Sequence, residues 1–345
     1  MNKGTNYLTY PYGQVESKGK IKQQPEDFKV VEQLGFSFTG AGEHLFLYVQ
    51  KIGLTTHELV NIIADELAVP ARQIGYSGLK DKHAITQQWL SIQLPGCKQQ
   101  PVITETEQFQ ILHRDWHDKK LRVGVHKTNQ FEITVRDIDG SVEQLSSTIE
   151  KIKNHGFANY FGEQRFGAQK DNVGQALRIL NNRHKSKRLT RTKKSLFISS
   201  LRSELFNQIL SNRITREFWQ QPVEGDASML AGTQSVFVEP ISNEIIRRYV
   251  EFDIHSGVSL FGIGESRLSL LAEEFENEVL SANPEICETL HNQKVKRSFR
   301  ANRAVARNLQ VEYLPEKDEI KLKVELDKGV YLTTLLNHFI NIDGE

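Results

Sequence analysis

Residues 43 to 50 read Glu-His-Leu-Phe-Leu-Tyr-Val-Gln, and residues 55 to 58, Thr-Thr-His-Glu, follow shortly after them. The first run is rich in β-branched and aromatic residues, which is typical of a strand buried on both faces. The second run has the form of a capping box, and apolar residues recur at helical spacing from Leu59 to Leu67 before Pro70 ends the pattern. A strand followed by an amphipathic helix predicts a mixed α/β domain.

Further strand-like runs follow at short intervals. They are predicted at residues 89–94, 109–112, 121–126 and 131–136, and again near the C-terminus at 309–313 and 320–326. Their close spacing favours antiparallel pairing, because parallel neighbours need long crossover connections. A second capping box at Ser141 opens a helix that is expected to end near Gly156, and a short helix is expected after Gly329.

The middle of the chain has a different pattern. From about Phe157 to Arg307 apolar residues recur at helical spacing, for example between Leu201 and Ile209, so this stretch is expected to be mostly helical. Strand signals return only after Arg307. We therefore expect residues 1–156 to begin an α/β domain, residues 157–307 to form an inserted helical domain, and residues 308–345 to complete the first domain.

The composition is that of an ordinary globular protein. The 345 residues are 38% hydrophobic and 25% charged, which is enough for two domains. No run of about 18 apolar residues occurs and no basic start precedes an apolar stretch, so we expect neither a membrane span nor export. Cys97 and Cys287 lie far apart, which argues against a disulfide framework or a thiolate zinc site and fits a reducing cytoplasm.

The net charge of +1 hides a strong segregation of charge along the chain. Residues 151–216 contain 15 basic and three acidic residues, whereas residues 217–290 contain three basic and 14 acidic ones. Residues 294–307 add six basic residues and no acid. Any single block could be a solvated charged face, but two basic blocks favour a phosphate backbone as the partner.

One turn presents an acid between two cations. Residues 75–83, Gly-Tyr-Ser-Gly-Leu-Lys-Asp-Lys-His, place Asp81 between Lys80 and Lys82 after two glycines. The flanking lysines would lower the pKa of Asp81 and keep it ionised, as a nucleophile or base requires, or they would simply neutralise its charge. Taken alone, the segment is better described as a surface turn with three solvated charges. It lacks the spacing of a phosphate-binding loop.

This segment resembles the signature of the TruD family of tRNA pseudouridine synthases, in which a Gly-Leu-Lys-Asp turn holds the catalytic aspartate. Three other stretches resemble family motifs in family order. These are Lys22–Glu32, which contains Pro-Glu-Asp-Phe-Lys-Val-Val-Glu; His126–Ile133, followed by Arg136; and residues 159–167, Asn-Tyr-Phe-Gly-Glu-Gln-Arg-Phe-Gly. The last resembles the segment that opens the family's inserted domain.

The resemblance implies a pseudouridine synthase core of the α/β (α+β) class, with a mixed, mainly antiparallel sheet, interrupted by an inserted TRUD domain. It implies tRNA as the substrate, uridine-13 as the target, and no cofactor or metal. His113-x-Asp115-x-His117 has a plausible metal spacing but no third soft ligand nearby, so a charged loop is the preferred interpretation. We expect a monomer, since the sequence contains no long heptad pattern or exposed apolar stripe that would indicate a protein partner.

The resemblance also assigns roles to residues. Asp81 is the catalytic carboxylate, which could attack C6 of the uracil ring or abstract a proton at C2′ to give a glycal; the sequence does not choose between these routes. Either route requires the uridine to be extruded from its stack. An extruded pyrimidine needs an aromatic face and a polar group that reads its edge.

Six residues are expected to bind the substrate or support the acid. Phe28 corresponds to an aromatic residue that contacts the nucleotide, Asn129 to an amide that binds it, and Phe131 to an aromatic residue close to the acid. Tyr331 stands where the family usually has Phe, Lys80 adjoins Asp81, and Lys22 is the expected ion-pair partner of Asp81. Without the resemblance, Phe28 and Phe131 would be interpreted as core residues and Asn129 as a turn residue.

Three other functions would explain parts of the same sequence pattern. A non-catalytic RNA-binding protein of the same fold would also explain the charge segregation, but it does not need the Lys80-Asp81-Lys82 turn. A methyltransferase needs a nucleotide-binding glycine loop, and residues 261–265, Phe-Gly-Ile-Gly-Glu, lack its third glycine. A metal-dependent nuclease needs clustered carboxylates, whereas the glutamates at 273–278 have the spacing of a solvated helix face.

Overall fold

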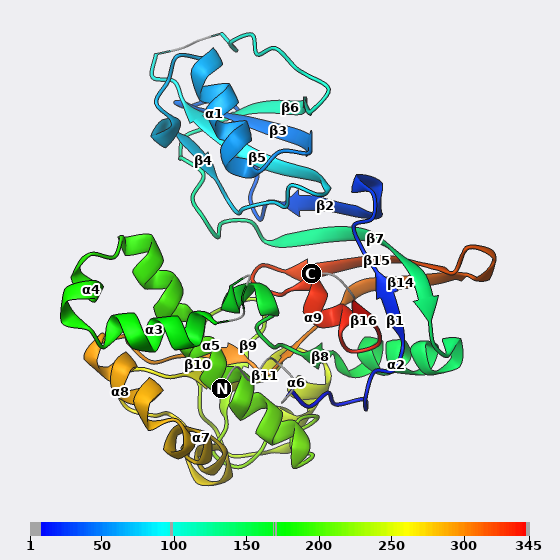
Figure 1. Ribbon diagram of the computed structural model, residues 1–345, viewed down its shortest axis with the longest axis vertical. Helices are drawn as coiled ribbons and strands as arrows, with labels where there is room; N and C mark the ends of the chain where they lie inside the picture. The colour runs from blue at the N-terminus through cyan, green and yellow to red at the C-terminus, as the bar shows by residue number, and fades with distance from the viewer. Residues whose placement is uncertain (1–7, 97–98, 168, 170, 343–345) are drawn as a thin grey trace. The chain divides into compact units, whose positions relative to one another are not determined.

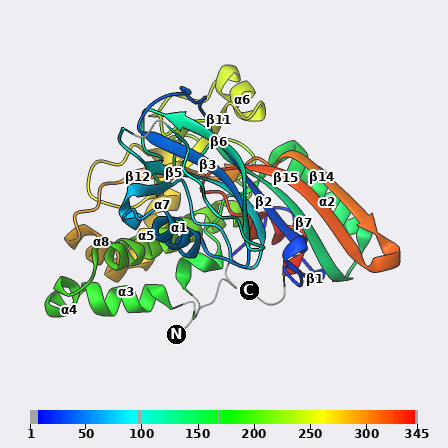
Figure 2. The ribbon, with the colours of Figure 1, turned by 90° about the horizontal axis from the view of Figure 1, so that it is seen from above.

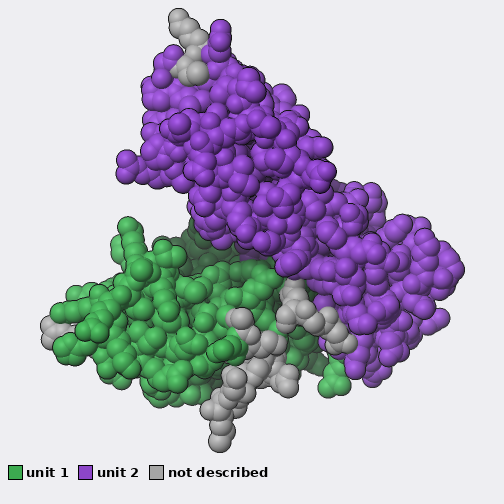
Figure 3. All heavy atoms as spheres, turned by 45° about the horizontal axis from the view of Figure 1, so that its top comes forward, with its two compact units in different colours: residues 1–15, 147–305, 331–339 green, residues 16–146, 306–330, 340–345 purple. Residues whose placement is uncertain are grey.

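The computed structural model describes residues 8–96, 99–167, 169 and 171–342, and for Arg183 it describes the backbone alone. Cys97 and the first six residues, which entered the expectations above, lie outside the described part. The chain forms two compact units, coloured separately in Figure 3. Unit 1 comprises residues 1–15, 147–305 and 331–339, and unit 2 comprises residues 16–146, 306–330 and 340–345.

Unit 2 contains eleven of the strands and helices labelled in Figure 1, and α2 (Val142–His155) contributes residues to both units. In chain order its elements are β1 (Lys18–Lys20), β2 (Phe28–Gln33), β3 (His44–Ile52), α1 (Thr56–Glu66), β4 (Ile74–Tyr76), β5 (Ile85–Gln93), β6 (Phe109–His117), β7 (Thr128–Asp139), β14 (Arg307–Leu314), β15 (Glu319–Asp327) and β16 (Asn341–Ile342).

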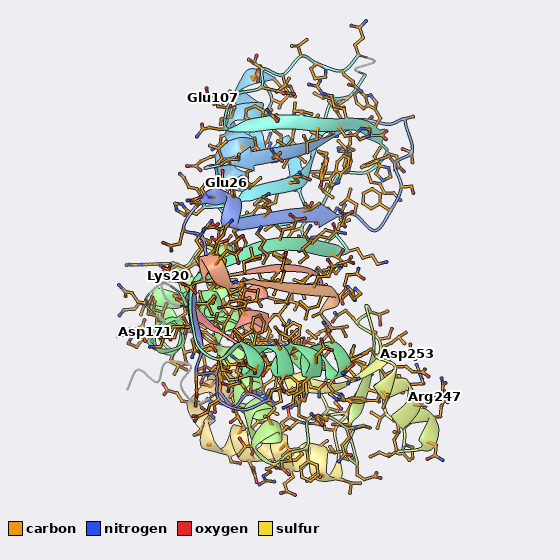
Figure 4. The ribbon with its side chains drawn as sticks, turned by 90° about the vertical axis from the view of Figure 1, so that its right-hand side faces the viewer. Lys20, Glu26, Glu107, Asp171, Arg247 and Asp253 are labelled. Carbon is orange, nitrogen blue, oxygen red and sulfur yellow. The ribbon has the colours of Figure 1, made fainter. Side chains whose placement is uncertain are left out.

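These strands form one mixed sheet in the order β14-β15-β7-β2-β5-β3-β6, with β1 beside β7 and β16, and β4 beside β5. Neighbours are antiparallel except β2 with β5 and β1 with β16. Figure 4 shows the strands side by side, with Lys20 on β1 and Glu26 in the 3₁₀ turn that leads into β2. The predicted fold class, α/β with a mixed and mainly antiparallel sheet, is confirmed.

Strand β3 and helix α1, which correspond to the strand and helix predicted from residues 43–50 and 55–67, pack together in a core of this unit. Leu45 and Leu47 of β3 pack with Leu59 and Ile63 of α1, and all four side chains are fully buried. Burying each such side chain stabilises the fold by about 1.5–3 kcal/mol. The predicted capping box is present, because Thr55 Oγ1 accepts a hydrogen bond from Glu58 N and the Glu58 carboxylate accepts one from Thr55 N.

The strand predicted at residues 121–126 is wrong. This segment is a turn in which Gly124 has a φ of +81°, a conformation that a strand does not contain. Its backbone groups bond to serines and to a carbonyl instead: Leu121 N donates to Ser91 Oγ, Gly124 N to the Ser77 carbonyl and His126 N to Ser77 Oγ. The alternating apolar residues therefore belong to a turn whose backbone bonds to serines, and not to a strand paired in a sheet.

Unit 1 carries most of the helices. In chain order its elements are β8 (Phe157–Ala158), α3 (Asn172–Leu180), α4 (Arg183–Lys187), α5 (Arg191–Thr215), β9 (Ala227–Leu230), β10 (Val236–Phe237), α6 (Asn243–Val250), β11 (Ile254–Leu260), α7 (Leu270–Ala282), α8 (Pro284–Asn292), β12 (Ser298–Ala301), β13 (Arg303–Ala304) and α9 (Leu332–Leu336).

Unit 1 also contains a sheet, which the expectation of a mostly helical segment did not include. Strands β10, β9, β11 and β12 form a four-stranded sheet, and β13 pairs with β8. The long helix α5 buries Leu201, Leu205 and Phe206 in the same core as Phe275 of α7. Strand β11, Ile-His-Ser-Gly-Val-Ser-Leu, is almost wholly buried and mixes serines with apolar residues, so it shows no alternation by which the sequence could have revealed it.

Candidate active site

Three segments of unit 2 meet where neighbouring strands in the interior of its sheet begin or end. Strand β2 begins at Phe28 and runs parallel to β5, with Lys29 opposite Ile85. Strand β3 is antiparallel to β5, with Lys51 near its end opposite Thr86. The start of β2, the end of β3 and the turn that precedes β5 therefore lie together, and Asp81 is in that turn.

Asp81 is held as a carboxylate. Lys22 Nζ lies 2.7 Å from Asp81 Oδ2, and His83 N donates to Asp81 Oδ1 at 3.0 Å. Burial acts to raise the pKa of Asp81, but the hydrogen bond and the charge of Lys22 outweigh it, so the pKa lies below its usual value. The ion pair between Lys22 and Asp81 expected from the resemblance is present in the structure. Asp81 keeps about a third of its side-chain surface exposed, which leaves room for a reactant.

The two lysines that flank Asp81 in sequence point at other acids, which corrects the expectation that they hold Asp81 ionised. Lys80 Nζ lies 2.5 Å from Glu32 Oε2, and Lys82 Nζ lies 3.0 Å from Glu58 Oε1. The Lys80–Glu32 pair is almost completely buried. Neighbours in a turn leave the backbone in different directions, so Asp81 receives its cation from a different segment of the chain.

Lys51 is a residue of this site that the sequence patterns did not reveal. Its side chain is fully buried, and its ammonium group donates to the main-chain carbonyls of Asp81 at 2.7 Å and Leu54 at 2.6 Å. Burial lowers the pKa of Lys51 to about 8, against the opposing charge of Asp81. The signal in the sequence is a lysine just beyond the predicted strand, two positions after the apolar run that ends at Val49.

The rest of the turn is also fixed from several sides. Ser77 Oγ lies 2.6 Å from His126 Nδ1 and accepts a hydrogen bond from His126 N at 2.7 Å. Lys80 N donates to Thr56 Oγ1 at 2.9 Å, at the start of α1. The misassigned segment 121–126 thus anchors one end of the turn and α1 the other, which holds Asp81 in place before any substrate arrives.

An aromatic and amide surface lies on one face of β2 and β7. In the antiparallel register Val30 is opposite Phe131 and Glu32 opposite Asn129, so Phe28, Phe131 and Asn129 share a face. The Phe28 and Phe131 rings are 6.3 Å apart at 77°, and Lys22 Nζ lies 4.7 Å from the Phe28 ring centre. Lys22 therefore contacts both Asp81 and Phe28.

Asn129 has an unused acceptor. Its Oδ1 is buried and has no hydrogen-bond partner among the residues that the structure describes. A buried polar atom without a partner is costly, and at a functional site it is typically satisfied by a ligand. An amide beside aromatic rings suits the edge of a base, which offers both donors and acceptors.

Tyr331 belongs to unit 1, whereas the other six predicted site residues belong to unit 2. Its hydroxyl accepts a hydrogen bond from Arg165 Nη2 at 2.5 Å, and its ring centre lies 6.4 Å from that of Phe161. Arg165 and Phe161 both come from the motif at residues 159–167. That motif therefore supports the ring of Tyr331.

Two further findings concern the described residues alone. No group of three or more His, Cys, Asp and Glu side chains among them is arranged to hold a metal ion. His113 instead lies 3.9 Å from Asp115, and His117 3.3 Å from Asp118. None of the helices in the described ranges is both long and apolar enough to cross a membrane.

An ionised carboxylate on a fixed turn, beside aromatic rings and an unpaired amide oxygen, defines a site suited to chemistry on a planar, hydrogen-bonding substrate. Comparison with known proteins specifies the family. The model of the family described as tRNA pseudouridine synthase D (TruD) matches residues 4–186 and 180–339. The chain belongs to the TruD family of tRNA pseudouridine synthases, and it is an isomerase of the TruD type.

Individual relatives agree over nearly the whole chain. The tRNA pseudouridine synthase D of Methylococcus capsulatus is 36% identical over 345 residues, covering 99% of this chain and 96% of its own length. That of Hydrogenovibrio crunogenus is 32% identical, covering 99% and 98%. The crystal structure of a TruD candidate from Methanosarcina mazei superposes with a TM-score of 0.73 at 22% identity, covering 96% of this chain and 95% of that one, and supports the fold.

Proposed function

We propose that this chain isomerises uridine-13 of tRNA to pseudouridine, with Asp81 as the catalytic carboxylate and the target base flipped out of its stack. Formation of pseudouridine in tRNA follows from the family. The particular uridine and the role of Asp81 go beyond it. The observation that carries the role of Asp81 is its ion pair with Lys22, because this pair keeps the carboxylate ionised while part of it stays exposed.

The reaction breaks the bond between N1 and C1′ and forms a bond between C5 and C1′. The C5 proton is lost and N1 gains a proton, so no oxidant or reductant is consumed. Asp81 serves either as the nucleophile that attacks C6 or as the base that removes the C2′ proton. Both routes need a charged carboxylate, which the Lys22 ion pair supports.

The other predicted site residues have matching roles in this proposal. Phe28 and Phe131 offer ring faces and edges against which the extruded uracil packs. Asn129 Oδ1, which has no partner among the described side chains and backbone groups, accepts the N3–H of the uracil. Lys22 sets the charge state of Asp81, and Lys80 acts through its buried pair with Glu32 by fixing the turn. Tyr331 stacks on the nucleotide.

We also propose the domain division and oligomeric state expected from the sequence. Residues 157–307 would be the inserted TRUD domain, and residues 1–156 and 308–345 the catalytic domain. The long middle segment of unit 1, residues 147–305, supports that division, although residues 1–15 and 331–339 also cluster with unit 1. The chain is proposed to act as a monomer, which gel filtration at micromolar concentration would test.

The experiment that tests the function maps pseudouridine in a tRNA transcript incubated with the purified protein, without added metal or nucleotide. One modified uridine at position 13 is expected. Conversion of another position would refute the assignment of uridine-13. Binding of tRNA without conversion of any uridine would support the rival function, a non-catalytic RNA-binding protein.

A further inference from the structure

Many arginines of the two basic blocks are engaged in contacts within the protein. In the second block, residues 294–307, the arginines are used inside the structure. Arg297 pairs with Glu276, Arg303 stacks 3.7 Å from the Tyr249 ring centre, and Arg307 lies 2.5 Å from Asp327. Arg300 donates to the Asn159 carbonyl at 3.0 Å and lies 4.2 Å from the Phe161 ring centre. This block therefore stabilises the fold and offers few cations to a partner.

Much of the first block is used in the same way. Arg213 forms a buried pair with Asp226, Arg216 pairs with Glu274, and Arg178 pairs with Asp171. Arg202 donates to the carbonyl of Leu260 at 2.7 Å. A count of cations along the sequence therefore overstates the positive charge that is available at the surface.

Six cations that lie close together in the sequence are not engaged in this way. They lie on α4, on the first turn of α5 and between the two helices, and we call them the α4–α5 basic corner: Lys185, Lys187, Arg188, Arg191, Lys193 and Lys194. Five of them are exposed and Lys194 is partly buried. Across the described ranges, none of the six forms an ion pair with an acid. Figure 2 shows α4 at one end of unit 1, beside α3.

The corner borders a shaped surface. A hollow of about 430 Å³ is lined by Lys187 and Lys194 together with polar side chains, those of Asn181, Ser186, Asn292 and Gln293. Leu180 and the acidic Glu288 complete its lining. Amide, hydroxyl and ammonium groups are the donors that contact phosphate and sugar oxygens in nucleic-acid complexes, and a carboxylate accepts a hydrogen bond from a ribose hydroxyl.

We propose that the α4–α5 basic corner is a docking surface for the phosphate backbone of the tRNA substrate, outside the catalytic site. This inference rests on the proposed function for its partner. Six unpaired cations with no acid between them favour a polyanion. The arginines named above are engaged within the protein, whereas the cations of this corner form no ion pair in the described ranges and most of them are exposed. Contacts of this kind position an RNA without reading its bases.

The test compares two triple variants that remove the same charge. Lys185→Gln/Lys187→Gln/Lys193→Gln neutralises half of the corner. Lys119→Gln/Lys317→Gln/Lys321→Gln neutralises three exposed lysines of unit 2 that have no ion-pair partner among the residues that the structure describes. The tRNA dissociation constant is measured by filter binding across a range of salt concentrations. The conversion rate is measured with saturating enzyme, and both variants are checked by thermal unfolding.

The corner variant is expected to bind tRNA about tenfold more weakly, and the slope of log K against log salt should fall by roughly 2–3 because each lost phosphate contact changes it by about 0.7–0.9. Its conversion rate with saturating enzyme should equal that of wild type, and the matched variant should bind as wild type does. Wild-type affinity and slope in the corner variant would overturn the proposal, as would an equal loss in the matched variant. Because binding is measured directly, this outcome is independent of whether wild type converts uridine-13.

Discussion

The buried ammonium group of Lys51 donates a hydrogen bond of 2.7 Å to the main-chain carbonyl of Asp81, and a second one of 2.6 Å to the carbonyl of Leu54. Lys51 thus ties the end of β3 to the turn that carries the catalytic carboxylate. Its charge is surrounded by Asp81 and Lys80 from that turn and by Glu58 from α1. Lys51 is assigned as a positioning residue, because its buried ammonium group binds the backbone of Asp81.

We expect Lys51→Met to slow conversion by about 10- to 100-fold at saturating tRNA, since a charge-assisted hydrogen bond contributes about 1.5–3 kcal/mol. Lys51→Arg, which keeps a cation, should recover part of the rate. KM should change little in either variant, because the RNA-binding surface is intact. A normal rate in Lys51→Met would contradict this role.

Alkaline pH gives an independent test of Lys51. Its pKa of about 8 in the folded protein lies below the ordinary value of 10.5, so the native state loses the proton first. The rate should therefore fall as pH rises through about 8, whereas the stability contribution of Lys51 should increase between about 8 and 10.5. In Lys51→Arg the fall in rate should move to higher pH. Titration of the uracil itself affects both enzymes equally, so identical alkaline profiles would refute the assignment.

Lys22→Met should move the acid limb of the rate to higher pH. In wild type the pKa of Asp81 is depressed, so the charged form and its stability contribution persist until pH falls through that lowered value. Lys22 is the main group that opposes the effect of burial on Asp81. Without Lys22, burial therefore raises the pKa of Asp81. Lys82→Met is the matched control, because Lys82 pairs with Glu58. Equal shifts in the two variants would show that Lys22 has no special relation to Asp81.

The buried Arg213–Asp226 pair should dominate the electrostatic stability of unit 1. Arg213 Nη1 lies 2.6 Å from Asp226 Oδ1, and Asp226 also accepts hydrogen bonds from Val223 N and Ser256 Oγ. Asp226→Ala leaves a buried guanidinium unpaired and should lower the free energy of unfolding by about 3–5 kcal/mol in urea. Arg247→Ala, which breaks the exposed pairs of Arg247 with Glu244 and Glu251 (Figure 4), should leave that free energy unchanged. Similar losses in both variants would contradict this ranking.

Much of the sheet could be predicted from the sequence, because patterns along one strand report its burial. The run from Glu43 to Gln50 and the alternation from Phe131 to Arg136 both correspond to strands. The strand prediction for residues 121–126 was wrong because the apolar residues alternate, whereas Gly124 and the contacts with serines impose a turn. Periodicity of apolar residues indicates which side chains are buried, but it does not indicate which groups accept the hydrogen bonds of the backbone.

The site was predicted unevenly for a related reason. The motif resemblance pointed to Asp81 and Lys22, which the fold brings within 2.7 Å of each other although 58 positions separate them in sequence. It could not reveal that Lys80 faces Glu32, or that Lys51 reaches the Asp81 carbonyl, because side-chain directions in a turn and contacts between strands depend on the tertiary fold. The basic blocks show the same limit, since charge in sequence does not tell which cations stay unpaired.

Single-turnover conversion by Asp81→Asn tests whether Asp81 performs the chemistry. The asparagine keeps the shape of the side chain and removes its charge. With saturating enzyme, we expect Asp81→Asn to bind the tRNA transcript with wild-type affinity and to form no detectable pseudouridine, while Asp115→Asn on β6 converts it normally. Pseudouridine formation by Asp81→Asn at the wild-type rate would show that the Asp81 carboxylate is not the catalytic group.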